Sequence, residues 1–167
     1  MAGRAFVAGI CLLCLAAAAP APAAQALIGS VAPDFALKGV DGLNRRLSEY
    51  RGRVVLINFY ARWAGDSRVE MPALDHLDAT YRRAGLVVLG VSVDEDLERA
   101  REFAIGMHVA YPVLLDGGPR IGSAYAIERM PMTVLIDRSG IVRFVKVGYE
   151  RDDYRTFVAE IRALLRE

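Results

Sequence analysis

The first residues whose type and spacing suggest chemistry are Cys11 and Cys14, the only cysteines in this 167-residue chain. Their Cys-x-x-Cys spacing is that of a dithiol redox pair. Both, however, lie inside the uninterrupted apolar run from Ala5 to Ala19, where cysteine behaves as a small hydrophobic residue. We therefore predict that neither cysteine is a redox residue.

The same apolar run indicates a secretory signal peptide. Arg4 gives it a positive start, and its length of about 15 residues is short of the roughly 20 that a spanning helix needs. Ala24-Gln25-Ala26 follows as a small-x-small cleavage pattern. We expect residues 1–26 to be removed and residues 27–167 to form one periplasmic or otherwise exported domain. The alternative is an uncleaved N-terminal segment that anchors the protein in a membrane.

The composition of residues 27–167 restricts the classes of partner. Arg4 is the only charged residue before them, so they carry 20 basic and 20 acidic side chains. A balanced charge gives no electrostatic reason to expect nucleic acid as a partner, and we expect membrane contact only if the signal is uncleaved. These residues also contain no cysteine, and a domain without thiols cannot exchange disulfides.

A second group of candidate residues follows the lone tryptophan, in the segment Trp63-Ala64-Gly65-Asp66-Ser67. A serine nucleophile needs a base beside it. His76 stands nine residues further along the same predicted helix, more than about 13 Å away along its axis, and His108 follows a different helix. The spacing therefore argues against a serine hydrolase. We expect Asp66 and Ser67 to act mainly as helix caps.

The elements that would position these residues alternate between strands and helices, which is typical of a layered α/β domain. The continuous apolar runs are typical of strands covered on both faces, and the helix between them predicts a parallel crossover. We expect Asp94 to cap the second helix, and glycines to adopt positive φ at Gly85 and in the Asp137–Gly140 turn. The expected elements are a hairpin over 33–47, strands over 53–59, 86–93 and 111–115, helices over 67–84, 94–106 and 119–126, a hairpin over 133–147 and a C-terminal helix.

Several segments together resemble a known family. The segment from Phe59 to Pro72, FYARWAGDSRVEMP, is similar to the pattern F-W-A-x-W-C-x-P-C-x-x-E-x-P of exported thioredoxin-like proteins of the TlpA/ResA type. Further matches lie at 32–35, at 47–53 and at 129–137. The resemblance implies a thioredoxin fold: a central mixed sheet flanked by helices, with an N-terminal β extension and a central α/β insert.

The resemblance also implies a peptide-binding edge. Pro131 matches a cis-proline that faces the active-site loop, and we expect it to be cis; its position alone also permits an ordinary trans proline that starts a strand. A cis bond there would leave the Met130 main chain open to pair with an extended peptide. Trp63 would then lie at the rim of the former active site, as an anchor for the peptide or only as a cover for the loop.

The departures from the family pattern determine the expected function. The thiol positions hold Ala64 and Ser67, Asp66 replaces the usual proline, and Glu70 matches a glutamate close to the thiols, where it can hydrogen-bond beneath the loop. We therefore expect no catalytic residue, no cofactor and no metal, and a non-catalytic module that binds an exported protein or peptide in extended conformation. The alternative is the family activity, a thiol-disulfide oxidoreductase or a peroxiredoxin-like enzyme.

A third hypothesis is copper handling by soft ligands. Its candidate ligands are Met71, Met130, Met132 and His76. Met130 and Met132 would share a face if their segment is extended. Methionines at strand and helix positions more often fill a core.

Overall fold

The structure of the protein is a computed structural model that describes residues 23–167. The predicted signal peptide, with both cysteines, lies outside the described residues except for residues 23–26. Among the described residues, no helix is both long enough and apolar enough to cross a membrane.

One mixed sheet forms the centre of the described part of the chain, with the strand order β2-β1-β5-β4-β3-β6-β7. Its strands are β1 (Ala36–Gly39), β2 (Asn44–Arg46), β3 (Val54–Tyr60), β4 (Leu86–Ser92), β5 (Val113–Leu115), β6 (Met132–Ile136) and β7 (Val142–Val147). The three central strands β3, β4 and β5 are parallel, and the others pair antiparallel. This confirms the predicted mixed sheet, and β1 and β2 are the N-terminal β extension.

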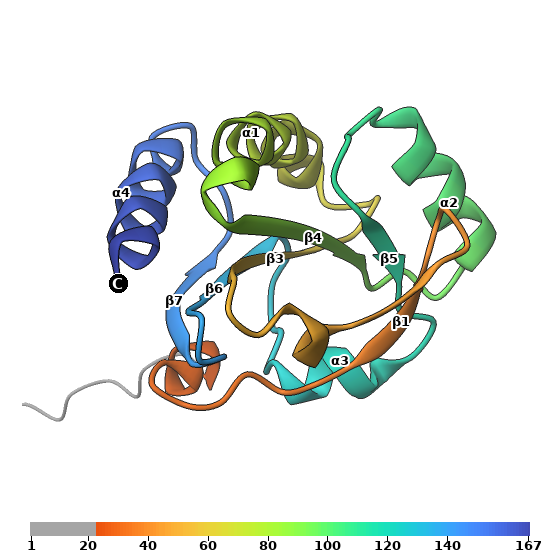
Figure 1. Ribbon diagram of the computed structural model, residues 1–167. Helices are drawn as coiled ribbons and strands as arrows, with labels where there is room; N and C mark the ends of the chain where they lie inside the picture. The colour runs from red at the N-terminus through yellow and green to blue at the C-terminus, as the bar shows by residue number, and fades with distance from the viewer. Residues whose placement is uncertain (1–22) are drawn as a thin grey trace, which may run out of the picture.

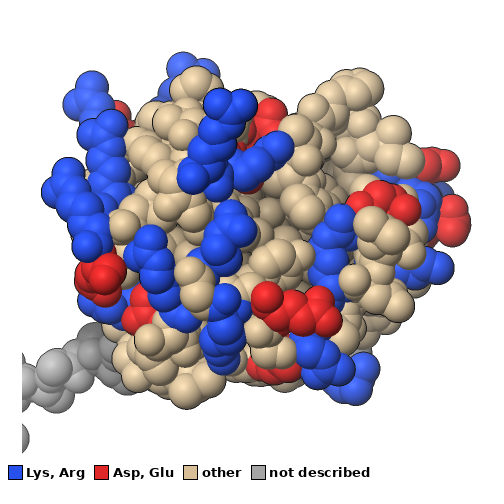
Figure 2. Space-filling model, in the orientation of Figure 1, with Lys and Arg blue, Asp and Glu red and all other residues tan. Residues whose placement is uncertain are grey.

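Helices cover both faces of the sheet (Figure 1). They are α1 (Gly65–Tyr81), α2 (Leu97–Gly106), α3 (Pro119–Ala124) and α4 (Asp153–Arg166), with short 3-10 helices η1 (Ala23–Leu27), η2 (Leu47–Tyr50) and η3 (Arg82–Ala84). Apolar side chains of α1, α2 and α4 form one core cluster with the sheet, while α3 and the N-terminal segment form the other. Basic and acidic side chains are interspersed over the outer surface in the face seen in Figure 2.

The β3–α1–β4 unit positions the candidate site. All seven residues of β3 are buried, as predicted for a strand covered on both faces, and β3 pairs in parallel with β4 from Val54↔Leu86 to Tyr60↔Ser92. Gly85 ends the crossover helix with φ of +115°, which confirms its predicted left-handed conformation. The carboxyl ends of the parallel strands therefore meet beside the loop that leads into α1.

The start of α2 differs from the prediction. The helix begins at Leu97, and its N-cap is Asp96, whose carboxylate accepts a hydrogen bond from the Arg99 amide. The predicted cap, Asp94, is two residues too early and is buried at the end of β4 instead. Consecutive acidic residues offer several possible caps, and the exit of the chain from β4 selects among them.

The N-terminal segment covers part of the outer edge of β7. The Gln25 side-chain amide donates to the Val145 carbonyl at 3.2 Å, across 120 residues of sequence. Further along, the Gly29 amide donates to the Val142 carbonyl and the Val142 amide to the Ser30 carbonyl, at 2.8 and 2.9 Å. Ala24 is buried in the adjacent core. Residues 23–31 are therefore held by β7, including the residues of the predicted cleavage pattern.

Candidate functional site

The first turn of α1 holds the positions of the missing thiols. Ala64 is the N-cap, with extended φ and ψ of −84° and 108°, and its side chain makes no cap hydrogen bond. Asp66 and Ser67 already lie inside the helix, so their predicted role as caps is wrong. Asp66 is exposed in the first turn, where its charge complements the helix dipole. The Ser67 hydroxyl is fully buried and has no hydrogen-bond partner among the described residues.

The loop before α1 presents Trp63 to solvent, with 69% of its surface exposed. Asp94 fixes this loop, because its Oδ2 accepts hydrogen bonds from the Arg62 amide at 3.0 Å and from the Ser92 hydroxyl at 2.9 Å. The Val93 amide also donates to the Tyr60 carbonyl at 3.1 Å. The end of β4 thereby holds the loop in place, and the Trp63 side chain lies outside the core.

Beneath the loop, Glu70 is fully buried in a polar cluster. Thr133 Oγ1 donates to Glu70 Oε1 at 2.6 Å, and Asn58 Nδ2 donates to Glu70 Oε2 at 2.7 Å. This confirms that Glu70 hydrogen-bonds beneath the loop. Its partners were not predicted from the sequence, although each of the apolar strands β3 and β6 contains a polar residue that could have indicated them.

Burial dominates the titration of Glu70. Transfer of the carboxylate out of water raises its pKa from 4.5 to about 7, although the hydrogen bonds from Thr133 and Asn58 oppose the shift. The cluster therefore contains an acid that exchanges its proton near neutral pH. Because Ala64 and Ser67 stand at the thiol positions, Glu70 has no thiol with which to exchange this proton.

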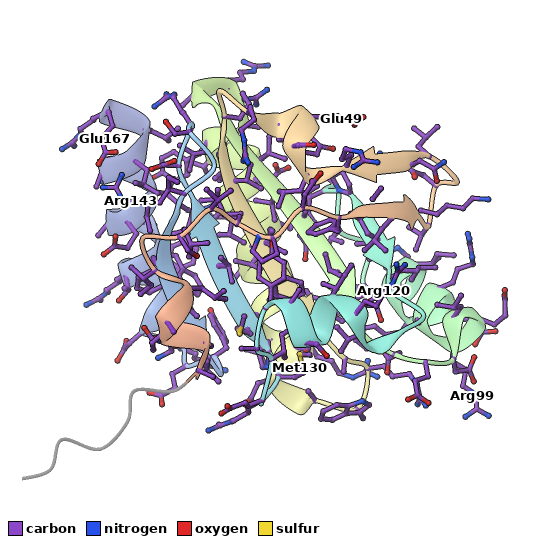
Figure 3. All side chains as sticks on the ribbon, turned by 90° about the horizontal axis from the view of Figure 1, so that it is seen from below. Glu49, Arg99, Arg120, Met130, Arg143 and Glu167 are labelled. Carbon is purple, nitrogen blue, oxygen red and sulfur yellow. The ribbon has the colours of Figure 1, made fainter. Side chains whose placement is uncertain are left out.

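On the other side of the loop lies the segment that precedes β6. The Met130–Pro131 peptide bond is cis. The pairing Phe59↔Met132 continues toward Met130 and Ala61, so Met130 lies beside the loop into α1, where Figure 3 also shows it. Neither its amide nor its carbonyl has a hydrogen-bond partner among the described residues. Its side chain is partly buried against the core.

The structure separates the residues of the copper hypothesis. Met71 and Met132 are fully buried in different core clusters on opposite faces of the sheet, and His76 lies beside the ring of Tyr154. Met130 and Met132 do share one cluster. Within residues 23–167, no group of three or more His, Cys, Asp or Glu side chains is arranged to hold a metal ion. The four proposed ligands therefore do not form one site.

A central strand, the loop that follows it, a helix N-terminus and a facing X-Pro segment together define a thioredoxin-fold domain. Comparison with known proteins agrees: residues 28–145 match the family model described as the AhpC/TSA family. The chain belongs to this family. Within it, the chain is similar to thiol-disulfide oxidoreductases of the ResA type.

Two curated relatives and two solved structures illustrate the similarity. The thiol-disulfide oxidoreductase ResA of Geobacillus kaustophilus is 35% identical over 72% of this chain and 70% of its own length. The ResA of Geobacillus thermodenitrificans is 32% identical over 81% of this chain and 78% of its own length. A candidate thiol:disulfide interchange protein DsbE from Chlorobium tepidum superposes with a TM-score of 0.79, at 33% identity, over 83% of this chain and 97% of that one. The exposed lipoprotein thioredoxin Etrx1 of Streptococcus pneumoniae superposes with a TM-score of 0.71, at 25% identity, over 79% of this chain and 100% of that one.

Proposed function

We propose that this protein is an exported, non-catalytic member of its family that binds an extended segment of a partner protein. One observation carries the proposal: the thiol positions hold Ala64 and Ser67, while the Met130 main chain beside them is unpaired among the described residues. Dithiol exchange needs a thiolate at the helix start and a second thiol to resolve the mixed disulfide. Main-chain pairing with an extended peptide needs neither.

Trp63 supports the same proposal. A large, exposed aromatic side chain beside an unpaired main-chain segment is the arrangement of an interface anchor. Export is supported by the apolar N-terminal run and by the similarity to the exposed lipoprotein thioredoxin of Streptococcus pneumoniae. The names of the curated relatives favour the alternative, a thiol-disulfide oxidoreductase.

Two measurements on the purified protein test the proposal. In an insulin-reduction assay with dithiothreitol we expect no acceleration over buffer; thiol-dependent turnover would establish the alternative. In a selection from a displayed library of random heptapeptides we expect binders, and Trp63→Ala should weaken the best of them at least about tenfold, as an anchor does.

Leu43→Ala is the matched control for Trp63→Ala. Leu43 is 60% exposed at the β1–β2 turn, so its truncation also removes exposed apolar surface without disturbing the core. Equal effects of the two variants, or a library that yields no binder, would contradict the proposed function. Thermal unfolding of both variants should match the parent, because neither side chain is buried.

A further inference from the structure

A hollow opens between α1 and α2, next to the Trp63 loop. It has a volume of about 590 Å³ and is lined by Arg62, Arg68, Arg99, Glu102, Phe103 and Gly106. Three guanidinium groups and one carboxylate therefore line it. Figure 3 shows Arg99 projecting outward from α2. The excess of positive charge belongs to the lining itself, because the carboxylates of Asp94 and Asp96 that face Arg62 and Arg99 do not line the hollow.

The three arginines differ in how far they are neutralised within the described part of the chain: Arg62 and Arg99 each have one loose ion pair, with Asp94 and Asp96, and Arg68 has none. The guanidinium carbon of Arg68 lies 4.5 Å from the centre of the Phe103 ring. Such stacking orients the guanidinium plane and leaves its N–H edge free for an anion. Asp94 already accepts two hydrogen bonds, and its Oδ1 is 3.7 Å from Arg62 Nε, beyond hydrogen-bond range. Arg62 Nε is buried without a hydrogen-bond partner among the described residues.

Arg99 is only weakly paired. Its Nε lies 3.3 Å from Asp96 Oδ2, and both side chains are about half exposed or more. An ion pair in that position contributes little and exchanges readily with solvent or with a ligand. The hollow is thus lined by the guanidinium groups of three arginines, and an arginine fork matches a carboxylate in a bidentate manner.

We propose that this hollow receives acidic side chains of the bound partner. The proposal rests on the proposed function and extends it. Met130 precedes β6, the hollow borders α2, which follows β4, and β4 and β6 flank β3 on opposite sides. A segment paired with Met130 would therefore cross the loop that carries Trp63 to reach the hollow. The partner segment is therefore extended where it contacts Met130, and carries Asp or Glu beyond the residue that contacts Trp63. A peptide fits better than a lipid surface, because the charges line a hollow beside an open main-chain edge.

Capped hexaglutamate and hexaglutamine peptides test the proposal directly. Trp63 is the only tryptophan in the chain and directly follows Arg62, which lines the hollow, so we expect its fluorescence to report binding. At low ionic strength we expect hexaglutamate to bind at least about tenfold more tightly than hexaglutamine, and raised salt to abolish the difference. Arg62→Gln and Arg68→Gln should each remove most of that preference. Arg68→Lys should restore part of it, because the charge returns without the planar fork.

Arg83→Gln is the matched control, since Arg83 is an exposed arginine of η3, at the far end of α1. Equal binding of the two peptides, or an equal effect of Arg83→Gln and Arg68→Gln, would overturn the proposal. A preference for phosphatidylglycerol vesicles over hexaglutamate would replace it with a lipid-binding surface.

The outcomes also separate this proposal from the proposed function. If selected neutral heptapeptides bind through Trp63 while hexaglutamate does not bind, the acid-binding hollow is wrong and the peptide-binding module stands. If hexaglutamate binds through Arg68 while the library yields no binder, the hollow stands as an acid-binding site and the pairing at Met130 is wrong.

Discussion

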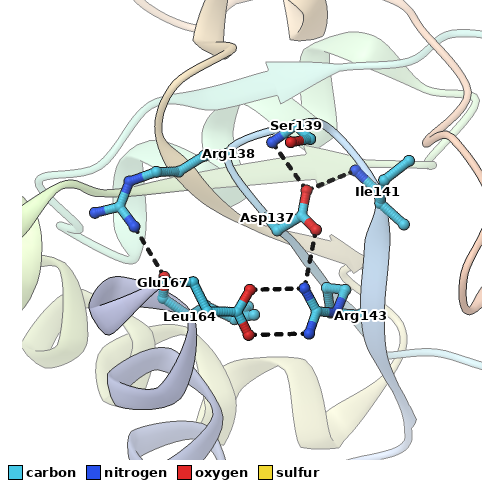
Figure 4. A network of polar contacts seen from close by, with 7 residues as sticks. All are labelled: Asp137, Arg138, Ser139, Ile141, Arg143, Leu164 and Glu167. Carbon is cyan, nitrogen blue, oxygen red and sulfur yellow. Dashed lines mark hydrogen bonds and ion pairs between the residues drawn. The ribbon is translucent and has the colours of Figure 1, made fainter.

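The polar groups at the two ends of the central sheet differ in how completely they are hydrogen-bonded. At the end where β3 leads into α1, buried polar atoms of Asn58, Arg62 and Ser67 have no hydrogen-bond partner among the described residues. At the opposite end, in the β6–β7 turn, Asp137 accepts hydrogen bonds from the Ser139 and Ile141 amides, both at 2.9 Å, and from Arg143. Arg143 is also paired twice with Glu167 after α4 (Figure 4).

This contrast separates groups that stabilise the fold from groups that the fold leaves available. Nearly all buried polar groups in proteins are paired, so each unpaired group requires an explanation. The turn at the Asp137 end satisfies its own donors and connects the last helix to the sheet. The α1 end holds Asn58 Oδ1, Arg62 Nε and the Ser67 hydroxyl in place without a partner among the described residues. We expect changes at the two ends to affect different properties.

The largest effect should come from returning sulfur to the α1 end. In the Ala64→Cys/Ser67→Cys variant, with Asp66→Pro added if needed, the helix N-terminus should lower the thiol pKa and allow disulfide exchange. We expect insulin reduction at neutral pH at least about tenfold faster than by a protein thiol of ordinary pKa. Leu43→Cys provides that reference, as an exposed cysteine far from any helix N-terminus. A folded but inert double-cysteine variant would show that more than the thiols has been lost.

Glu70 should give the next largest effect, on the pH dependence of stability. Its folded-state pKa of about 7 lies above the 4.5 of an ordinary glutamate, so between these values the folded state holds a proton that the unfolded chain releases. Its contribution is fully present below pH 4.5 and is lost as the pH rises to about 7, a change of about 3 kcal/mol. Urea unfolding across this range should show the decline in the parent. Glu70→Gln, which cannot ionise, should flatten it; a parallel decline in both would contradict the assignment to Glu70.

The Asp137 end should respond to pH with the opposite sign. Burial opposes ionisation of Asp137, but the hydrogen bonds from Ile141, Arg143 and Ser139 outweigh it and lower its pKa. Its contribution is therefore present above the unfolded pKa and is lost as the pH falls through the folded-state value. We expect Asp137→Ala to reduce the free energy of unfolding by about 2 kcal/mol at neutral pH, and less in acid, by urea titration. If the difference in free energy of unfolding between the parent and Asp137→Ala instead grew in acid, the assignment to Asp137 would be wrong.

The smallest effect should come from Ser67. Its buried hydroxyl has no partner among the described residues, so Ser67→Ala should raise the free energy of unfolding by about 1 kcal/mol. Ser123→Ala, at an exposed serine of α3, measures the gain from helix propensity alone. A loss of stability in Ser67→Ala, or a gain no larger than that of Ser123→Ala, would mean that the hydroxyl is satisfied after all.

Sequence patterns predicted the fold better than the details of the site. The continuous apolar runs predicted β3 and β4, and the turn predicted at Asp137–Gly140 is present, with Gly140 at φ of +81°. These signals are local. The caps at Asp66, Ser67 and Asp94 were wrong because a cap depends on where the chain leaves the preceding strand, which is set by the sheet.

The polar clusters were beyond local patterns for a different reason. Glu70 meets Thr133 across 63 residues of sequence, and Arg68 meets Phe103 from another helix. Only the parallel crossover and the strand order bring these partners together. The type of each residue was visible in the sequence, while its partner was a property of the topology.

The hydrogen bond from Gln25 to the outer edge of β7 has a consequence for aggregation. An open strand edge is a template for pairing with another chain, and proteins usually guard such edges. At one margin of this sheet the guard is β2, three residues long with two arginines; at the other it is the N-terminal segment. A cut after Ala26 would remove Gln25 and uncover the Val145 carbonyl, whereas a cut before Ala24 would keep it covered. The position of the cut therefore sets how much of β7 is open to edge-to-edge association between copies of the protein.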